Sequence, residues 1–489
     1  MKKKLYLIAH ISVWILGTAV LVSGAFNNNI WFDESYTVGL VKHSLSEIIK
    51  ISSADVHPPF YYIILKLYSM VFGTSIISLR MFSVLCASLL GGLGFTHLRK
   101  DFGEKIGFYY TLFTFLFIAT FNYAVEIRMY TLAPLLVTLM CIYAYRFYKS
   151  EMADKKSGIL LMFFSVLSAY THHYGLAAAG AVNFMLLIYS KRNKQLKKWF
   201  LMAAIQIAAY GYGLFLILQQ FLSVKGGFWI SMNYPDIAYQ AVSFFLLGDI
   251  TADGFSKTTL NIYYLVCFTF WIAFITFGYK YNKKHPDEMQ PVTLTMKTIG
   301  LVIGFFFVAS LKQPLYYIRY VMVLWGLIIF VLAFLYDKIR YKTAKTFVQF
   351  FLVALLIIRI VPFCQDMYSP KTAELDSFIE ESIKEGDIVI SENVILIPVV
   401  AVKHTDKQMV FYNIDCWGVE EAYEAFQPNM LTLRDISGVI NENSRVWIID
   451  ASDELCEYIT EKSGKTITNI YDVIELPYHD LRYVFTLME

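Results

Sequence analysis

Residues 5–22 read LYLIAHISVWILGTAVLV, an unbroken apolar run that follows Lys2, Lys3 and Lys4. The apolar core of a signal peptide is shorter, about 7–15 residues, so this run predicts an uncleaved first membrane helix. Runs of similar length recur along the chain, and about 20 such residues cross a hydrocarbon core of about 30 Å. Of the 489 residues, 57% are hydrophobic and 17% are charged, whereas a soluble domain carries roughly a quarter of charged residues. The sequence therefore predicts an α-helical polytopic membrane protein.

The charge of the chain divides near residue 365. Residues 366–489 contain 24 acidic and 9 basic residues, a net charge of −15, and the remainder contains 33 basic and 15 acidic residues, a net charge of +18. So sharp a break marks a domain boundary. We expect a membrane domain over residues 1–365 and a soluble α/β domain, called the tail below, over residues 366–489. In the tail we expect buried strands over 387–390 and 446–450. We expect helices over 372–384 and 451–462.

About eleven stretches are expected to span the membrane, and the lysines at the start place the N-terminus in the cytoplasm by the positive-inside rule. The expected spans are residues 5–25, 79–98, 106–121, 130–148, 158–171, 175–190, 199–222, 258–279, 294–311, 315–336 and 344–363. The loops rich in Lys and Arg then share the cytoplasmic side of the plasma membrane, and the tail lies outside. The apolar stretch 57–73 is short and interrupted by Lys66, so we expect an interfacial or re-entrant helix there.

The acidic pair in Trp31-Phe32-Asp33-Glu34-Ser35 directly follows the first apolar run. Two carboxylates beside a membrane are costly to dehydrate, which indicates a function. Such a pair can deprotonate a hydroxyl or hold a cation. The same outer loop carries Asp55 and His57.

Short polar motifs occur in the other loops expected on the outer side. They are Glu126-Ile127-Arg128-Met129-Tyr130, Thr171-His172-His173-Tyr174 and Arg319-Tyr320. We expect these carboxylates, imidazoles and arginines to converge on one cavity at the outer membrane surface.

The order of these motifs resembles that of the C-type (GT-C) membrane glycosyltransferases. The likeness is greatest to glycosyltransferase family 39, which includes protein O-mannosyltransferases and aminoarabinose transferases, and it covers roughly residues 1–365. It rests on Asp33-Glu34, Asp55-Val56-His57-Pro58-Pro59-Phe60-Tyr61-Tyr62, Glu126-x-Arg128-x-Tyr130, Thr171-His172-His173-Tyr174 and Arg319-Tyr320. Where aminoarabinose transferases have Glu-Lys before the double proline, this chain has Val56-His57.

The resemblance implies a polyprenyl-phosphate sugar donor and a hexosyl or pentosyl transfer on the extracytoplasmic face. The acceptor is then a lipid, a cell-wall polymer or a protein. Transfer from a lipid-phosphate sugar needs a base for the acceptor hydroxyl and cations for the departing phosphate. We expect Asp33 to be the base. We expect Arg128 and Arg319 to hold the phosphate, because a guanidinium matches two phosphate oxygens at once.

The stereochemical outcome depends on Glu34. A single displacement inverts the anomeric carbon, whereas a covalent route needs a second carboxylate as nucleophile. Adjacent residues of a helix or strand usually point in different directions, so we expect inversion. Supporting Asp33, binding a metal or capping a helix are the alternatives for Glu34.

The other motif residues are expected to bind donor or acceptor, and each has a structural alternative. Asp55 is alternatively a helix cap at Pro58, and His57 is alternatively an interfacial hydrogen-bonding group. Glu126 and Arg128 are alternatively an ion pair that fixes their loop. Tyr130 is alternatively part of an interfacial aromatic belt, and Tyr320 is expected beside Arg319.

No cofactor is required by this chemistry, and no nucleic-acid partner is expected. A divalent metal is an option through His172 and His173, although adjacent histidines without a third ligand are a weak pattern. A secondary transporter would carry ionisable groups near the bilayer midplane on broken helices. A non-catalytic scaffold or sensor would not need polar motifs gathered on one face. That gathering favours an enzyme over both rival classes.

Overall fold

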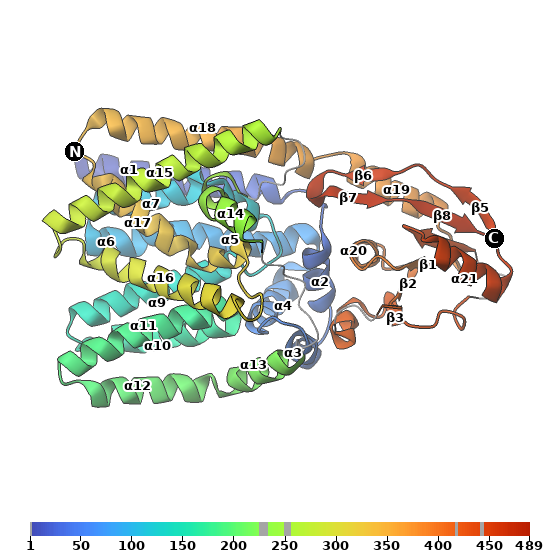
Figure 1. Cartoon of the computed structure of the whole chain (residues 1–489), viewed down its shortest axis with the longest axis horizontal. Coiled ribbons are helices and arrows are strands. Elements are labelled where there is room, and N and C mark those ends of the chain that lie inside the picture. The colour runs from blue at the N-terminus through green and yellow to red at the C-terminus, as the bar shows by residue number, and fades with distance from the viewer. Residues whose placement is uncertain (1, 224–232, 249–255, 416–418, 441–444) are drawn as a thin grey trace. The chain divides into compact units, whose positions relative to one another are not determined.

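The structure is a computed structural model of the chain, and it describes two compact units (Figure 1). The described residues are 2–223, 233–248, 256–415, 419–440 and 445–489. The helical unit comprises residues 1–25 and 80–360, and the mixed unit comprises residues 26–79 and 361–489. Residues 26–79, the first of the loops predicted to lie outside and called the first outer loop below, thus pack with the tail, although the membrane helices separate the two in sequence. The functional division at residue 365 stays a prediction.

The helical unit contains most of the helices. They are α1 (Lys2–Ala25), α5 (Ile76–Leu93), η1 (Gly94–Leu98), α6 (Arg99–Phe102), α7 (Glu104–Leu116), α8 (Ile118–Ala124), α9 (Leu132–Lys149), α10 (Lys155–Thr171), α11 (His173–Arg192), α12 (Leu196–Ala209), α13 (Gly211–Ser223), α14 (Tyr234–Leu247), α15 (Lys257–Lys284), α16 (Gln290–Ser310), η3 (Ile318–Leu324), α17 (Trp325–Lys338) and α18 (Lys342–Met367). Of these, α5 begins and α18 ends in the mixed unit. The helices α9, α10, α11 and α12 follow one another side by side (Figure 1).

Six helices among the described residues are long and apolar enough to cross a membrane. Two bent pairs, α7 with α8 at 64° and α12 with α13 at 59°, raise that number to eight. The prediction of a polytopic helical membrane protein is confirmed, while the count of eleven spans stays a prediction. Helix α4 (Phe60–Phe72) lies in the stretch expected to be re-entrant. Its 13 residues reach about 20 Å, which is too short for a bilayer.

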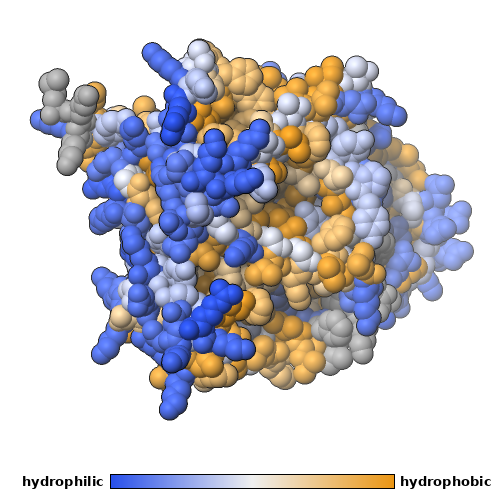
Figure 2. All heavy atoms as spheres, turned by 60° about the vertical axis from the view of Figure 1, so that its left-hand side comes forward, coloured by the Kyte–Doolittle hydropathy of each residue, from blue (hydrophilic) through white to orange (hydrophobic). Residues whose placement is uncertain are grey.

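The outer helices of the unit present apolar side chains to their surroundings. Only a small share of the apolar stretches of α15 and α18 is buried within the protein, whereas those of α5 and α17 are largely buried. Figure 2 shows broad hydrophobic areas of this kind beside a region where hydrophilic side chains gather. Exposed apolar patches of that size are typical of a surface covered by lipid.

The loops rich in Lys and Arg meet at one end of the helical unit. Arg146 pairs with Asp101 at 2.9 Å, and Lys338 pairs with Glu288 at 2.6 Å. Further hydrogen bonds join the remaining loops: Gln290 to Tyr148, and Gln195 to the carbonyl of Glu151. The predicted cytoplasmic loops, which begin at Arg99, Arg146, Lys191, Lys280 and Lys338, therefore lie at one end of this unit.

A close approach of two glycines joins α7 to the π-helix η1. A Cβ atom on Gly107 would lie 2.5 Å from the carbonyl oxygen of Gly94. Small residues of this kind let membrane helices pack at short distance, where dispersion and not hydrophobicity holds them together.

The mixed unit combines short helices with a sheet. Its helices are α2 (Phe32–Leu40), α3 (Leu45–Ala54), α4, α19 (Lys371–Ser382), α20 (Ile397–Lys403), η4 (Glu420–Phe426), α21 (Asp453–Ser463) and η5 (Tyr478–Asp480). Its strands are β1 (Ile388–Ser391), β2 (Gln408–Tyr412), β3 (Met430–Leu433), β4 (Val446–Ile449), β5 (Ile467–Ile470), β6 (Ile474–Leu476), β7 (Leu481–Tyr483) and β8 (Phe485–Met488).

The main sheet of the tail has the order β3-β2-β1-β4-β8-β5. The first four strands run parallel, with Ile390 opposite both Val410 and Ile448, and β8 is antiparallel to its two neighbours. All residues of β1 and β4 are buried, as expected for central strands covered on both faces. The predicted α/β tail is confirmed, including the two central strands and the helices α19 and α21.

Candidate functional site

Helix α2 carries the acidic pair in its first turn. Trp31 precedes the helix in an extended conformation, and Asp33 and Glu34 follow at positions where a helix dipole favours negative charge. Asp33 is partly exposed, whereas Glu34 has no solvent exposure. The two neighbouring carboxylates therefore have different environments, and only Asp33 is accessible to a reactant from solvent.

Glu34 is held by a residue from the far end of the chain. The hydroxyl of Tyr478 donates a hydrogen bond to Glu34 Oε2 at 3.3 Å, and both groups are buried. Beside it, the ring of His479 stacks on Trp31 with centroids 4.2 Å apart and planes 11° apart. Neither Tyr478 nor His479 follows from the sequence patterns, because nothing local marks them.

Asp55 and His57 lie between α3 and α4 and pair with each other. His57 Nδ1 is 3.2 Å from Asp55 Oδ2, and both side chains are partly buried. Asp55 is the C-cap residue of α3, and Pro59 is the N-cap residue of α4. Burial, together with the negative charge of Asp55, raises the pKa of Tyr423 in η4 to about 12. The predicted binding residues of this loop thus border the tail.

The first outer loop and the tail share several further contacts. Lys42 Nζ donates to the carbonyl of Val402 at 3.2 Å, and burial lowers the pKa of this lysine below its usual value. A Cβ atom on Gly39 would lie 2.5 Å from the carbonyl oxygen of Ala425, so α2 and η4 touch backbone to backbone. These contacts fix α2, and with it the acidic pair, against the tail.

In the helical unit, the motif around Arg128 lies on buried non-helical backbone between α8 and α9. Glu126 is 6% exposed and Arg128 is 3% exposed. The carbonyl of Glu126 accepts a hydrogen bond of 2.6 Å from Ser83 on α5, which fixes the course of the segment. Non-helical backbone beside membrane helices is tolerated where protein surrounds it. Buried charges at such places are costly, which makes Glu126 and Arg128 candidates for a functional role.

The loops that carry the motifs at residues 126–130, 171–174 and 319–320 meet around His172. Its ring centroid lies 6.1 Å from that of Tyr130 and 5.1 Å from that of Tyr320. Tyr174 completes the group, because it lies 5.7 Å from Tyr320 and stacks on Phe306 at 3.7 Å. The structure therefore brings together residues of three motifs that are far apart in sequence.

Arg319 lies in the 3-10 helix η3 beside this aromatic group and is 8% exposed. Its guanidinium carbon lies 5.7 Å from the ring centroid of Tyr317. The turn before η3 is fixed by Ser310, whose hydroxyl accepts hydrogen bonds from the backbone of Leu315 and Tyr316. A second buried arginine thus lies on a short 3-10 segment.

His172 and His173, the predicted metal ligands, take different places at the start of α11. His172 is the N-cap residue of α11, and its Nδ1 accepts a hydrogen bond of 3.1 Å from the backbone of Tyr174, while His173 begins the helix. Nδ1 of His172 is therefore engaged by its own helix. Within the described residues there is no group of three His, Cys, Asp or Glu side chains placed to hold a metal ion. A metal bound by this pair stays a prediction.

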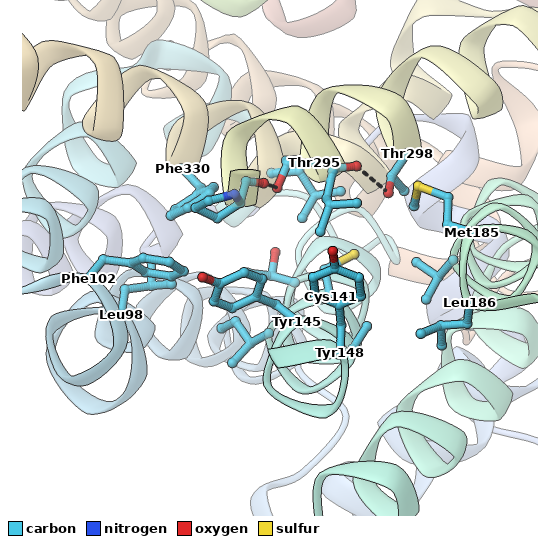
Figure 3. A pocket seen from close by; sticks show the side chains of 17 residues that line it. Leu98, Phe102, Cys141, Tyr145, Tyr148, Met185, Leu186, Thr295, Thr298 and Phe330 are labelled. Atoms are coloured by element: carbon cyan, nitrogen blue, oxygen red, sulfur yellow. Dashed lines mark hydrogen bonds between the residues drawn. The ribbon is translucent and has the colours of Figure 1, made fainter. Parts of the chain in front are cut away.

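A cavity of about 90 Å³ lies in the same unit and is lined by residues of α9, α11, α16 and α17, among others (Figure 3). Tyr145 and Tyr148 line it with aliphatic and aromatic neighbours. The hydroxyls of Thr295 and Thr298 donate to backbone carbonyls of their own helix. The cavity therefore offers an apolar surface and does not include the motif residues.

The chain has a GT-C-like fold, the fold of the C-type membrane glycosyltransferases. Among solved structures, it is similar to ArnT from Cupriavidus metallidurans in the apo state, with 10% identity, a TM-score of 0.58 and coverage of 100% of this chain and 98% of that chain. The same protein bound to undecaprenyl phosphate matches with 10% identity, a TM-score of 0.57 and coverage of 99% and 97%.

An oligosaccharyltransferase from Archaeoglobus fulgidus, in complex with Zn and sulfate, matches at 10% identity with a TM-score of 0.47, over 89% of this chain and 68% of that chain. No family model matches the chain, and no curated protein matches it in sequence.

Proposed function

We propose that this protein is a glycosyltransferase that moves a sugar from a polyprenyl-phosphate donor to an acceptor hydroxyl on the extracytoplasmic face of the plasma membrane. The observation that carries the proposal is Arg128, a buried guanidinium on non-helical backbone between membrane helices. Such a group binds phosphate through two hydrogen bonds. The undecaprenyl phosphate found in ArnT, which shares the fold, supports this ligand class.

In this proposal Asp33 is the general base and the reaction inverts the anomeric carbon. Its partial exposure suits a group that must meet an acceptor hydroxyl. Glu34 supports α2 from its buried position and does not act as a nucleophile. Arg128 and Arg319 neutralise the charge that develops on the departing phosphate.

The remaining motif residues have binding roles in the proposal. Asp55, His57 and Glu126 contact donor or acceptor, and Tyr130 and Tyr320 supply aromatic surfaces for the sugar or the isoprenoid. The transferred group is a hexose or a pentose, and the acceptor is a lipid, a cell-wall polymer or a protein. A divalent metal bound by His172 and His173 is an optional part of the proposal and is not required for the transfer.

The orientation follows from charge. The end of the helical unit that carries the Lys- and Arg-rich loops faces the cytoplasm, as does the N-terminus. The tail then lies outside, as a soluble domain over residues 366–489 attached to the transferase domain over 1–365.

Asp33→Asn tests the proposed base. The variant keeps the size and position of the side chain but removes the base, so transfer should fall by about 10²-fold or more. The readout is mass spectrometry of surface glycans, glycolipids and glycoproteins from cells that express each variant at equal level. Asp453→Asn, in the exposed first turn of α21, is the matched control and should leave the products unchanged. Unchanged products with Asp33→Asn would contradict the assignment.

Arg128→Lys tests the phosphate ligand separately. Lysine keeps the charge but loses the planar pair of donors, so binding of undecaprenyl phosphate should weaken by about tenfold or more. Native mass spectrometry of the full chain in detergent measures that binding. Arg192→Lys, at the exposed end of α11, is the control, and equal lipid occupancy in both variants would contradict the role of Arg128.

A further inference from the structure

A turn of the tail reaches the acidic pair. Strands β6 and β7 form a separate antiparallel sheet, with Leu476 paired to Leu481. Tyr478 lies in the turn between them and is 5% exposed. Its hydroxyl donates a hydrogen bond to Glu34. Because Glu34 is fully buried, this hydroxyl supplies a hydrogen bond that water would otherwise provide.

The next residue of the turn holds the other side of the motif. His479 stacks on Trp31, the residue directly before α2. The Tyr478 ring meets His479 edge-on, with centroids 4.4 Å apart, and lies edge-on to Phe363 at 6.5 Å. Two consecutive turn residues therefore contact Trp31 and Glu34, which bracket Asp33.

The backbone of the turn is constrained to make these contacts. His479 has φ 60° and Asp480 has φ 52°, both in the left-handed region that residues other than glycine rarely adopt. Such conformations persist where surrounding contacts determine them, and they cluster at functional positions. The stacked ring and the buried hydroxyl are contacts of that kind.

We propose that Tyr478 and His479 are positioning residues for the transfer reaction, which assigns to the tail a part in catalysis. Tyr478 fixes the side chain of Glu34, and His479 fixes Trp31. Together they hold the first turn of α2 so that Asp33 keeps one orientation. This inference rests on the proposed function of Asp33.

The alternative is that the turn only ties the tail to the loop. Both ideas predict a loss of stability when contacts are removed, so the test needs a readout specific to Glu34. Tyr483 provides the matched control: it lies in β7 of the same small sheet, is fully buried, and donates its hydroxyl to the carbonyl of Leu396 at 3.4 Å.

The experiment compares Tyr478→Phe, Glu34→Gln, the double variant and Tyr483→Phe in the full chain, with transfer measured on surface glycans at equal protein level. Loss of a hydrogen bond to a charged group should lower transfer by about tenfold or more in Tyr478→Phe. The double variant should be no slower than Glu34→Gln alone, because Tyr478 acts through Glu34. Tyr483→Phe should keep at least half of the activity.

Replacement of His479 gives a second, independent readout. His479→Ala removes the stacked ring and should lower transfer, whereas His479→Phe keeps an aromatic ring over Trp31 and should restore most of it. Equal activity of the two variants would overturn the role of His479. Equal losses in Tyr478→Phe and Tyr483→Phe, or additive losses in the double variant, would overturn the role of Tyr478.

Thermal unfolding of the same variants separates this inference from the proposed function. The changes in Tm for Tyr478→Phe and Glu34→Gln should be non-additive in the double variant, whether or not the chain transfers sugar. If Asp33→Asn leaves the products unchanged while this coupling is present, the proposed function fails and the contact stands. Additive changes in Tm would overturn the contact itself.

Discussion

Replacing Gly39 by alanine should push α2 away from the tail. The new Cβ atom would lie 2.5 Å from the carbonyl oxygen of Ala425 and 3.2 Å from its carbonyl carbon. Ordinary contact begins at 3.4 Å, so one backbone must retreat by about 0.9 Å. Neither neighbouring atom belongs to a flexible side chain, so no rotamer change relieves the clash.

The expected magnitude follows from two opposing effects. Overpacking against backbone costs about 1–3 kcal/mol, and a clash of this depth belongs in the upper half of that range. Alanine recovers up to about 1 kcal/mol as a better helix former than glycine. The net loss of folding free energy should therefore be about 1–2 kcal/mol. Since α2 carries Asp33, transfer should fall as well.

The assay is thermal unfolding of the full chain in detergent. Limited proteolysis within the tail reports when the mixed unit unfolds. Gly438→Ala is the matched control, because a Cβ atom there meets open space and the residue lies in the same unit. It should unfold at or slightly above the wild-type temperature. Gly39→Ala as stable as Gly438→Ala would refute the backbone contact between α2 and η4.

Three further predictions concern the tail and the helical unit. Burial is the largest single influence on the pKa of Asp387 and raises it, but the hydrogen bonds from Arg445, the Lys384 backbone and Trp447, together with the charge of Arg445, lower it overall. This contribution to stability is therefore complete above the unfolded pKa of about 3.9 and should be lost as the pH drops below about 4, which tryptophan fluorescence measures. Arg445→Met should lower the free energy of unfolding by about 2 kcal/mol, because its ion pair with Asp387 is only partly exposed. A urea unfolding curve that matches the wild type would contradict this. Gly326→Ala should reduce the folded yield in detergent, because its Cβ would clash with Thr138 Oγ1, whereas Gly300→Ala on α16 meets open space and should not.

The fold could be predicted from the sequence where the signal was local and repeated. Apolar runs marked the membrane helices, and the short apolar runs around Val389 and Trp447 marked the central strands β1 and β4. The bend between α7 and α8 could not be predicted, because the apolar pattern continues through Phe117 although its backbone is extended. Hydrophobicity reports burial in lipid or protein but not the direction of a helix axis.

The candidate site was predictable as a set of motifs but not as an arrangement. Short motifs placed Asp33, Arg128 and His172 beside membrane helices, and packing of their loops then brought Tyr130, His172 and Tyr320 together. The contact of Tyr478 with Glu34 joins residues 444 positions apart in sequence. No periodicity or motif in the tail signals such a contact, because a single buried hydroxyl leaves no pattern.

The pairing of the first outer loop with the tail has a physical reason in the size of the loop. Helices α2, α3 and α4 have 9, 10 and 13 residues, too few to bury a core by themselves. Their buried faces need a partner, and the tail supplies it through Ala425, Val402 and Tyr478. If Asp33 is the base, as proposed, this partner keeps it in one orientation, because preorganised groups do not have to reorient during the reaction. The contacts of the tail with α2 therefore give the tail a structural role at the acidic pair.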